Sequence, residues 1–168
     1  MSPPPPPLSH RLRTAAGLSP GEWARALEAA VLFHGFRVVL RVVPIRRLRG
    51  VLGPEGPRDA PLAAPPHRPD PAVFAVARAL RRVAKPHAAT CLPQALAGRV
   101  MLRRRGLPST LSLGARPDPD GPGAFAFHAW LRSGGVVLNV GGGPRRHAVL
   151  ATYHDPPAAA QRADRETT

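Results

Sequence analysis

Apolar residues recur at helical spacing in the segment that follows Ser19. Ser19, Pro20 and Glu22 have the identities of an N-cap, a first-turn proline and the third residue of a capping box, which predicts a helix start. Proline cannot continue a helix interior, so we expect this helix to end or kink at Pro44, with at most one further turn after it. Its predicted apolar positions are Trp23, Leu27, Val31, Val38, Val39 and Val42.

Two further helices are predicted downstream. Asp70 and Pro71 repeat the N-cap and first-turn signature, and Pro86 would stop that helix. Thr90 is the expected N-cap of the next helix, and Gly106 is its expected C′ residue. The predicted apolar faces consist of Val73, Val76, Leu80 and Val83 in the first of these helices and of Leu92, Leu96 and Val100 in the second.

Beyond the third helix the hydrophobic period changes from helical spacing to alternation, which predicts strands. Along the middle strand, Phe127 and Ala129 share one face, whereas His128 and Trp130 share the other. A hairpin turn is expected at residues 133–135. The predicted strands cover residues 110–115, 124–132 and 136–140, and residues 141–168 are expected to be mostly loop and tail. Helices followed by a small antiparallel sheet predict an α+β fold.

Proline-rich segments divide the chain. Six prolines lie between residues 50 and 69, which predicts an extended linker there. The predicted organisation is a disordered arm at residues 1–18, an N-terminal helix at 19–49, the linker at 50–69, a folded core at 70–155 and a disordered tail at 156–168.

The chain is strongly basic, with 24 Lys and Arg residues against 10 Asp and Glu residues and a net charge of +14. Such a balance is typical of proteins that bind nucleic acid or an acidic peptide, and also of sequences rich in Arg, Ala, Pro and Gly for compositional reasons. Aromatic residues make up only 5% of the chain, which weighs against single-strand stacking platforms, so we expect no nucleic-acid partner.

Other classes are excluded by what the sequence lacks. The single cysteine excludes an internal disulfide framework and a cysteine-clustered zinc site, and the histidines show no metal-ligand spacing, so we expect no metal and no cofactor. The proline run at the start is not a secretory signal peptide. The most apolar stretch, residues 24–43, carries charges that exclude a membrane span, so a cytoplasmic location is predicted. A basic helix lying on an anionic membrane surface remains an alternative.

Cys91 and His128 are the residues that could carry chemistry. Cys91 falls at the predicted N-terminus of a buried helix, where the helix dipole lowers a thiol pKa, and His128 lies in a strand that must pack near that helix. The pair suits a thiolate and an imidazolium. The alternative is structural, since a lone cysteine is often a small buried hydrophobe and a strand histidine a core residue.

The residues around this cysteine and histidine resemble a known enzyme family. Residues 89–96 (ATCLPQAL) resemble the nucleophile helix of the leader peptidases of lasso-peptide biosynthesis. Residues 127–131 (FHAWL) and 134–139 (GGVVLN) resemble the family's histidine strand and hairpin, and residues 44–48 (PIRRL) its leading segment. These enzymes are transglutaminase-like cysteine proteases, and the resemblance implies a core of the transglutaminase-like and papain-like kind.

The resemblance also implies an activity, the removal of the leader from a lasso precursor peptide before a separate cyclase closes the macrolactam. Cys91 matches the family's nucleophile and His128 its general base, which would protonate the leaving amine. The backbone N–H of Cys91 would contribute to an oxyanion hole, and Gln94 is a candidate second donor or simply a surface helix residue.

The third catalytic residue departs from the family pattern. The family places an aspartate where this chain has Val140, preceded by Asn139. With a three-residue turn Asn139 would face away from His128, whereas a bulge at the turn would return it to the same face. An asparagine suffices chemically as an orienting residue, so Asn139 is the expected third member. Asp155 or Asp120 could supply a carboxylate instead.

The resemblance further implies partners. In these pathways a small winged-helix domain captures the leader, and residues 1–69 show no strand pattern for one. We therefore expect a separate recognition protein as a partner, beside the precursor peptide and the cyclase. The N-terminal helix either docks that protein or packs on its own core. The competing interpretations are a basic, non-catalytic module that binds acidic peptide or nucleic acid, and an acyltransferase that uses the same Cys-His pair.

Overall fold

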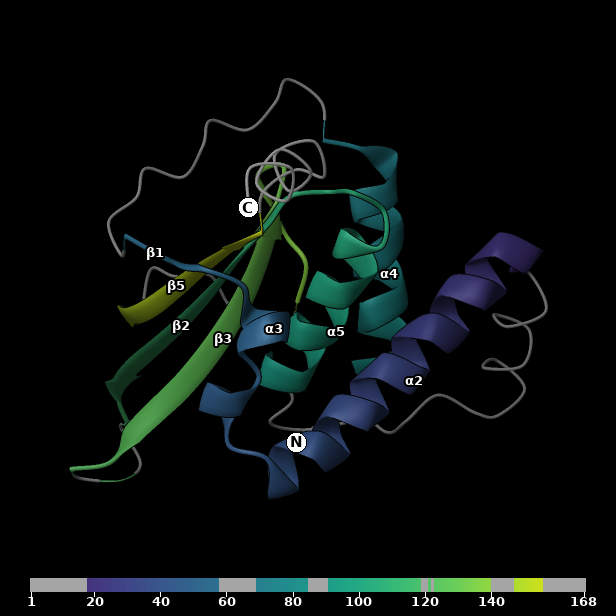
Figure 1. The fold of residues 1–168 in the computed structure, drawn as a ribbon. Helices are drawn as coiled ribbons and strands as arrows, with labels where there is room; N and C mark the ends of the chain where they lie inside the picture. Colours follow the sequence, from purple (N-terminus) through teal and green to yellow (C-terminus); the bar gives the residue numbers. More distant parts are fainter. Residues whose placement is uncertain are drawn as a thin grey trace, which may run out of the picture.

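The computed structural model describes residues 18–57, 69–84, 91–118, 121, 123–139 and 147–155. Within these residues, helices pack on one side of a five-stranded antiparallel sheet with the strand order β1-β5-β2-β3-β4 (Figure 1). The helices are α2 (Pro20–Val42), α3 (Arg49–Leu52), α4 (Pro71–Ala84) and α5 (Cys91–Arg103), with a 3-10 turn, η1, at Ile45–Arg47. The strands are β1 (Glu55–Gly56), β2 (Ser109–Pro117), β3 (Phe125–Ser133), β4 (Val136–Val137) and β5 (Ala148–Asp155). The predicted α+β class is confirmed.

Helix α2 begins and ends where the sequence predicts, but it buries a different face. The Ser19 capping box is present, and the helix ends at Val42, just before Pro44. Ala29 and Phe33 are buried against the other helices, whereas most of the apolar positions named from the sequence face solvent. Trp23, Leu27, Val31, Val38 and Val42 are all exposed. Because α2 has apolar residues on both sides, their spacing alone could not decide which side packs inward.

Helix α4 matches its prediction closely. The Asp70 carboxylate accepts a hydrogen bond of 2.7 Å from the backbone N–H of Ala72, as an N-cap does. The apolar residues Val73, Val76 and Leu80 are buried. The opposite face of the helix is basic, so a single face could pack inward. The expected stop at Pro86 lies outside the described residues.

Helix α5 is the central helix, packed between α2, α4 and the sheet. A side chain at Gly98 would lie 2.7 Å from atoms of both Leu80 and Leu131, so glycine permits α5 to touch α4 and β3 at once. At its C-terminus, the N–H groups of Gly106 and Leu107 close a Schellman motif, with Gly106 at a φ of 68°. The predicted C′ glycine is therefore confirmed, while Thr90 lies outside the described residues.

The sheet is larger than the sequence indicated. Residues 148–155, expected to be loop, form β5, which pairs with β2 along its length. Residues 50–57, expected to begin an extended linker, include the end of α3 and strand β1, which pairs with β5. Both corrections have one physical reason, because these short strands are stabilised by pairing with residues far away in the sequence.

The hairpin between β3 and β4 has a shorter turn than predicted. Ser133 pairs with Val136, and Gly134 and Gly135 have φ values of 53° and 80°, which only glycine adopts readily. The register is therefore one residue different from that of a three-residue turn. Strand β4 covers two residues instead of the predicted 136–140.

None of the helices in the described part of the chain is both long enough and apolar enough to cross a membrane.

Candidate functional site

Cys91 is the first residue of α5, as the sequence predicts. Its thiol is free and half-buried, and the side chain packs against the hydrophobic core. A helix N-terminus presents backbone N–H groups and a partial positive charge, which favour a thiolate over a thiol. The position therefore suits a nucleophile.

Helix α5 and strand β5 run in the same direction, which fixes where Cys91 lies. Arg99 donates a 3.0 Å hydrogen bond to the carbonyl of Tyr153, and one turn later the Nε of Arg103 lies 2.8 Å from the carboxylate of Asp155. Strands β3 and β5 both pair antiparallel to β2, so α5 runs along β3 as well. Arg103 also donates to backbone carbonyls before β1, which ties the C-terminal end of α5 to α3.

The charge buried beneath this anchor is Arg99, whose side chain is fully buried. Burial lowers the pKa of Arg99 to about 10, and the nearby Asp155 carboxylate partly offsets that effect. Asp155 is thus a partner of Arg99 and Arg103. It pairs with Ser109 at one end of β2, whereas His128 pairs with Gly114 five residues further along. At about 3.3 Å per residue, this separation leaves Asp155 too far away to orient His128.

Cys91 and His128 lie at the same end of the sheet. Gly98 of α5 packs against Leu131 of β3. From that contact, Cys91 is seven helical residues back, or about 10 Å, and His128 is three strand residues back, also about 10 Å. Because the two elements run in the same direction, the thiol and the imidazole reach the same level of β3.

The two residues belong to opposite sides of that strand. Ala129 and Leu131 join the hydrophobic core under the helices, as the predicted alternation requires. His128 and Trp130 therefore lie on the other face. The ring contacts described for His128 are with aromatic side chains on its own side of the sheet.

His128 belongs to a stack of three rings. Its ring centroid lies 6.0 Å from that of Trp130, at an interplanar angle of 22°, and 5.3 Å from that of His147, at 27°. The Trp130 and His147 rings are 6.1 Å apart. Gly114 makes this possible, since a side chain there would lie 2.7 Å from the buried indole of Trp130. The stack restricts the orientation of the His128 imidazole.

His147 is the site residue that the sequence did not reveal. It precedes β5, the strand that the sequence analysis missed, so it was interpreted only as a loop residue without metal-ligand spacing. Burial, and secondarily the charge of Arg116, lowers the pKa of His147, which favours the neutral ring beside His128. A prediction of β5 and of its pairing with β2 could have found it. In the described residues no cluster of three or more His, Cys, Asp or Glu could hold a metal ion.

Asn139 makes contacts other than those of an orienting residue. Its Oδ1 accepts a 2.8 Å hydrogen bond from the N–H of Leu131, and its Nδ2 donates a 2.6 Å bond to the carbonyl of Ala129. The buried amide therefore binds the β3 main chain before and after Trp130, as the main chain of a neighbouring strand would do. Asp120 and Val140 lie outside the described residues.

Gln94 lies one turn after Cys91 and is buried, so it is not the surface residue that was considered as its alternative role. It lies on the same side of α5 as Cys91, three residues further along the helix. The helix N-terminus suits Cys91 as a nucleophile, while His128 lies at the same level of the sheet but on the opposite face of β3.

Comparison with protein families agrees with this fold. The family model described as the transglutaminase-like superfamily matches residues 30–154, which include Cys91, His128 and most of the described elements. Comparisons with the curated proteins and with the solved structures found no significant match. The superfamily contains typically cysteine-dependent enzymes, among them cysteine peptidases and acyltransferases. Because the match covers well over half of the chain, this protein belongs to the transglutaminase-like superfamily.

Proposed function

We propose that this protein is a cysteine peptidase that removes the leader from a lasso precursor peptide. The observation that carries the proposal is the place of Cys91: the chain's single cysteine is the first residue of α5, inside the segment that matches the superfamily. The resemblance of residues 89–96 and 127–131 to the lasso leader peptidases supplies the substrate.

In the proposed reaction the Cys91 thiolate attacks the last carbonyl carbon of the leader. The C–N bond to the core peptide breaks, His128 gives its proton to the leaving amine, and the leader remains as a thioester. Water activated by His128 then hydrolyses the thioester, which releases the leader as a free acid and restores the thiol. The backbone N–H of Cys91 stabilises the oxyanion, with the Gln94 amide as the proposed second donor.

Asn139 takes a positioning role in this proposal. Its amide binds the main chain of Ala129 and Leu131, next to the strand residue that carries the imidazole. We assign it to holding β3, and hence His128, at the level of Cys91. The rings of Trp130 and His147, which stack against the His128 ring, would restrict the orientation of the imidazole itself.

The proposed partners are the precursor peptide, a separate winged-helix protein that recognises the leader, and the lasso cyclase. The proposed reaction needs neither a metal nor a cofactor, because the thiolate, imidazole and backbone donors supply the chemistry. The site is proposed to act in the cytoplasm, where a reduced thiol is maintained.

The test combines a chemical and an enzymatic measurement. The chain has a single thiol, so the fast phase of alkylation by iodoacetamide, measured by intact mass and absent in Cys91→Ala, reports Cys91. We expect rapid alkylation of wild type at neutral pH and slower alkylation of His128→Ala under the same conditions. A lasso precursor encoded near this gene is then incubated with its recognition protein and with wild type, Cys91→Ala, Cys91→Ser or His128→Ala.

Mass spectrometry should show an intact leader acid with wild type and none with Cys91→Ala. We expect His128→Ala to lose about 10²–10⁴-fold in rate, as loss of a general acid-base group does. A leader released as an amide of an added amine would indicate an acyltransferase instead. Slow alkylation together with equal, absent cleavage by wild type and Cys91→Ala would contradict the enzymatic proposal and favour the basic binding module.

A further inference from the structure

The outward side of α2 carries a series of exposed apolar side chains, with His34 and Arg41 as the exposed polar residues among them. Five large side chains on it, Trp23, Leu27, Val31, Val38 and Val42, are 50%, 65%, 64%, 60% and 77% exposed. They follow one another at intervals of four or seven residues, which places them on one side of the helix. We call this surface the α2 stripe. A helix of 23 residues extends over about 34 Å. The stripe is therefore an extended apolar surface and not a single exposed apolar residue of the kind that is common on proteins.

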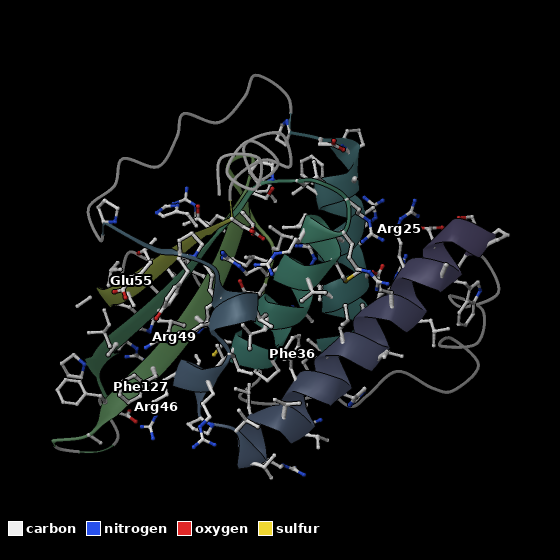
Figure 2. All side chains as sticks on the ribbon, in the orientation of Figure 1. Arg25, Phe36, Arg46, Arg49, Glu55 and Phe127 are labelled. Carbon is white, nitrogen blue, oxygen red and sulfur yellow. The ribbon has the colours of Figure 1, made fainter. Side chains whose placement is uncertain are left out.

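The stripe is not a core face that failed to pack. The opposite side of α2 is fully used: Ala29 and Phe33 are buried, and Phe36 lies between α2 and α5 (Figure 2). Glu28 forms ion pairs with Arg104 and Arg105 of the segment after α5, the shorter at 2.6 Å. These contacts fix the rotation of α2, so the apolar side is held outward.

The charge near the stripe is positive. The two acidic side chains of α2 are already paired, Glu22 with Arg82 and Glu28 with the arginines after α5. Arg41 lies on the exposed side between Val38 and Val42, and further exposed arginines follow in η1. A surface that complements this one combines apolar side chains with carboxylates.

The shape of the stripe favours a helix as its occupant. At its centre Gly35 has open space around it, with no atom within 4 Å of where a side chain would begin. Val31 and Val38 lie one turn before and one turn after Gly35, with the exposed His34 between them on the same side of the helix. An i to i+4 ridge of large side chains on another helix can pack along such an exposed helix face.

From these observations we propose that the α2 stripe is the docking site of a partner protein, which binds through an amphipathic helix with an apolar ridge and acidic flanks. A second copy of this chain fits less well. Two copies paired through their stripes would bring like charges together, because each stripe carries the exposed Arg41 and the chain as a whole has a net charge of +14. An anionic membrane fits less well too, because the valines and the glycine of the central part insert little apolar volume.

The test uses a synthetic probe and the full-length chain. The probe is a helical peptide of about 20 residues with leucines at intervals of four and three, glutamates on both flanks and no aromatic residue. A twin peptide has lysine in place of every glutamate. Binding is followed by tryptophan emission, because Trp23 is half exposed whereas the only other tryptophan, Trp130, is buried.

We expect the acidic peptide to shift the emission of Trp23 to shorter wavelength in a saturable way. The double variant Leu27→Ser with Val38→Ser should weaken binding at least tenfold, and the lysine twin should bind at least tenfold more weakly than the acidic peptide. The matched control, Phe125→Ser with Leu150→Ser, changes two exposed apolar residues of the sheet and should bind as wild type does. Added salt should weaken binding by screening the charges.

Equal binding by the stripe variant would overturn the proposal, because attraction would then come from net charge alone. So would equal binding of the lysine twin. Vesicles of phosphatidylcholine with phosphatidylglycerol that shift Trp23 while the peptide does not would indicate a membrane surface. If light scattering showed wild type to be a dimer and the stripe variant to be a monomer, the occupant of the stripe would be a second copy of this chain. All of these measurements report binding alone, so their failure is distinguishable from failure of the peptidase assay.

Discussion

Helices α2 and α4 both pack against α5, and both carry apolar residues at helical spacing, but only α4 buries the residues that this spacing selects. In α4, Val76 and Leu80 face the core while Arg78 and Arg81 lie on the opposite side. In α2 the regular series from Trp23 to Val42 faces solvent. The difference teaches that apolar spacing identifies the buried face only when the opposite face is polar.

Contacts with other elements decide the rotation of α2. Phe33 fills the space against α4 and α5, and Ala29, one turn before it, permits close approach. Glu28 then pairs with Arg105 from beyond α5 at 2.6 Å. The local sequence of α2 reveals none of these partners, because α4, α5 and Arg105 all lie much further along the chain. A tertiary contact thus overrides a local pattern here.

The first prediction compares the two sides of α2 directly and has the largest expected effect. Phe33→Ala should lower the free energy of unfolding by about 3–5 kcal/mol, because it removes a buried aromatic ring and leaves a cavity. Leu27→Ala, on the exposed side, should change it by less than about 0.5 kcal/mol. Urea unfolding followed by far-UV circular dichroism measures both values.

Leu80→Ala of α4 is the matched control for Phe33→Ala, with an expected loss of about 2–5 kcal/mol. If Leu27→Ala destabilised the isolated chain as much as Phe33→Ala, the exposed side of α2 would be packed in solution. The rotation of the helix described above would then be wrong.

Two helical glycines sharpen the same contrast at a smaller scale. Gly98→Ala should destabilise the chain by about 1–3 kcal/mol, because the added methyl group would overlap Leu80 and Leu131 in a closely packed region. Gly35→Ala should stabilise it by about 0.5–1 kcal/mol, since alanine is the better helix former and the site is open. Thermal and urea unfolding of both variants test the pair.

Effects of the same sign at the two glycines would contradict this description. A destabilising Gly35→Ala would mean that another surface already covers the centre of the α2 stripe. A neutral Gly98→Ala would mean that α5 can move away from β3, and that the level of Cys91 relative to His128 is not fixed by this contact.

Features that depend on neighbouring residues were predictable from the sequence. The caps at Ser19, Asp70 and Gly106 appear where expected, since each satisfies backbone groups within its own turn. The alternation around Trp130 also predicted the two faces of β3 correctly. Strand β5 was not predicted, because its residues acquire a regular structure only by pairing with β2, more than 30 residues away.

The candidate site divides in the same way. Cys91 at the start of α5 and His128 in a strand follow from local pattern and motif. His147 does not, because its contact with His128 requires both β5 and the absence of a side chain at Gly114. The contacts of Asn139 depend on the length of the hairpin turn, and the shift of one residue at Gly134 and Gly135 changed them.

The smallest effect on stability is expected at the N-terminus of α2, where α2 and α4 differ in how their first turns are capped. Glu22 accepts a hydrogen bond of 3.1 Å from the backbone N–H of Ser19, and the Ser19 hydroxyl accepts one from the N–H of Glu22. The bond from the Ser19 backbone lowers the pKa of Glu22, with smaller contributions from the Ser19 hydroxyl and from Arg82. No such reciprocal pair is seen in the described residues at the start of α4, where Asp70 alone caps the helix.

A carboxylate whose pKa is lowered by folding stabilises the folded state above its unfolded pKa of 4.5 and loses this contribution as pH falls through the folded pKa. Glu22→Gln should therefore be less stable than wild type near neutral pH, and this difference should be smaller at about pH 3, because the contribution of the carboxylate is lost as it protonates. Urea midpoints at the two pH values measure this, with the exposed Glu55→Gln of β1 as the matched control. A deficit of Glu22→Gln that persisted unchanged in acid would show that the shape of the side chain, and not its charge, supports the cap.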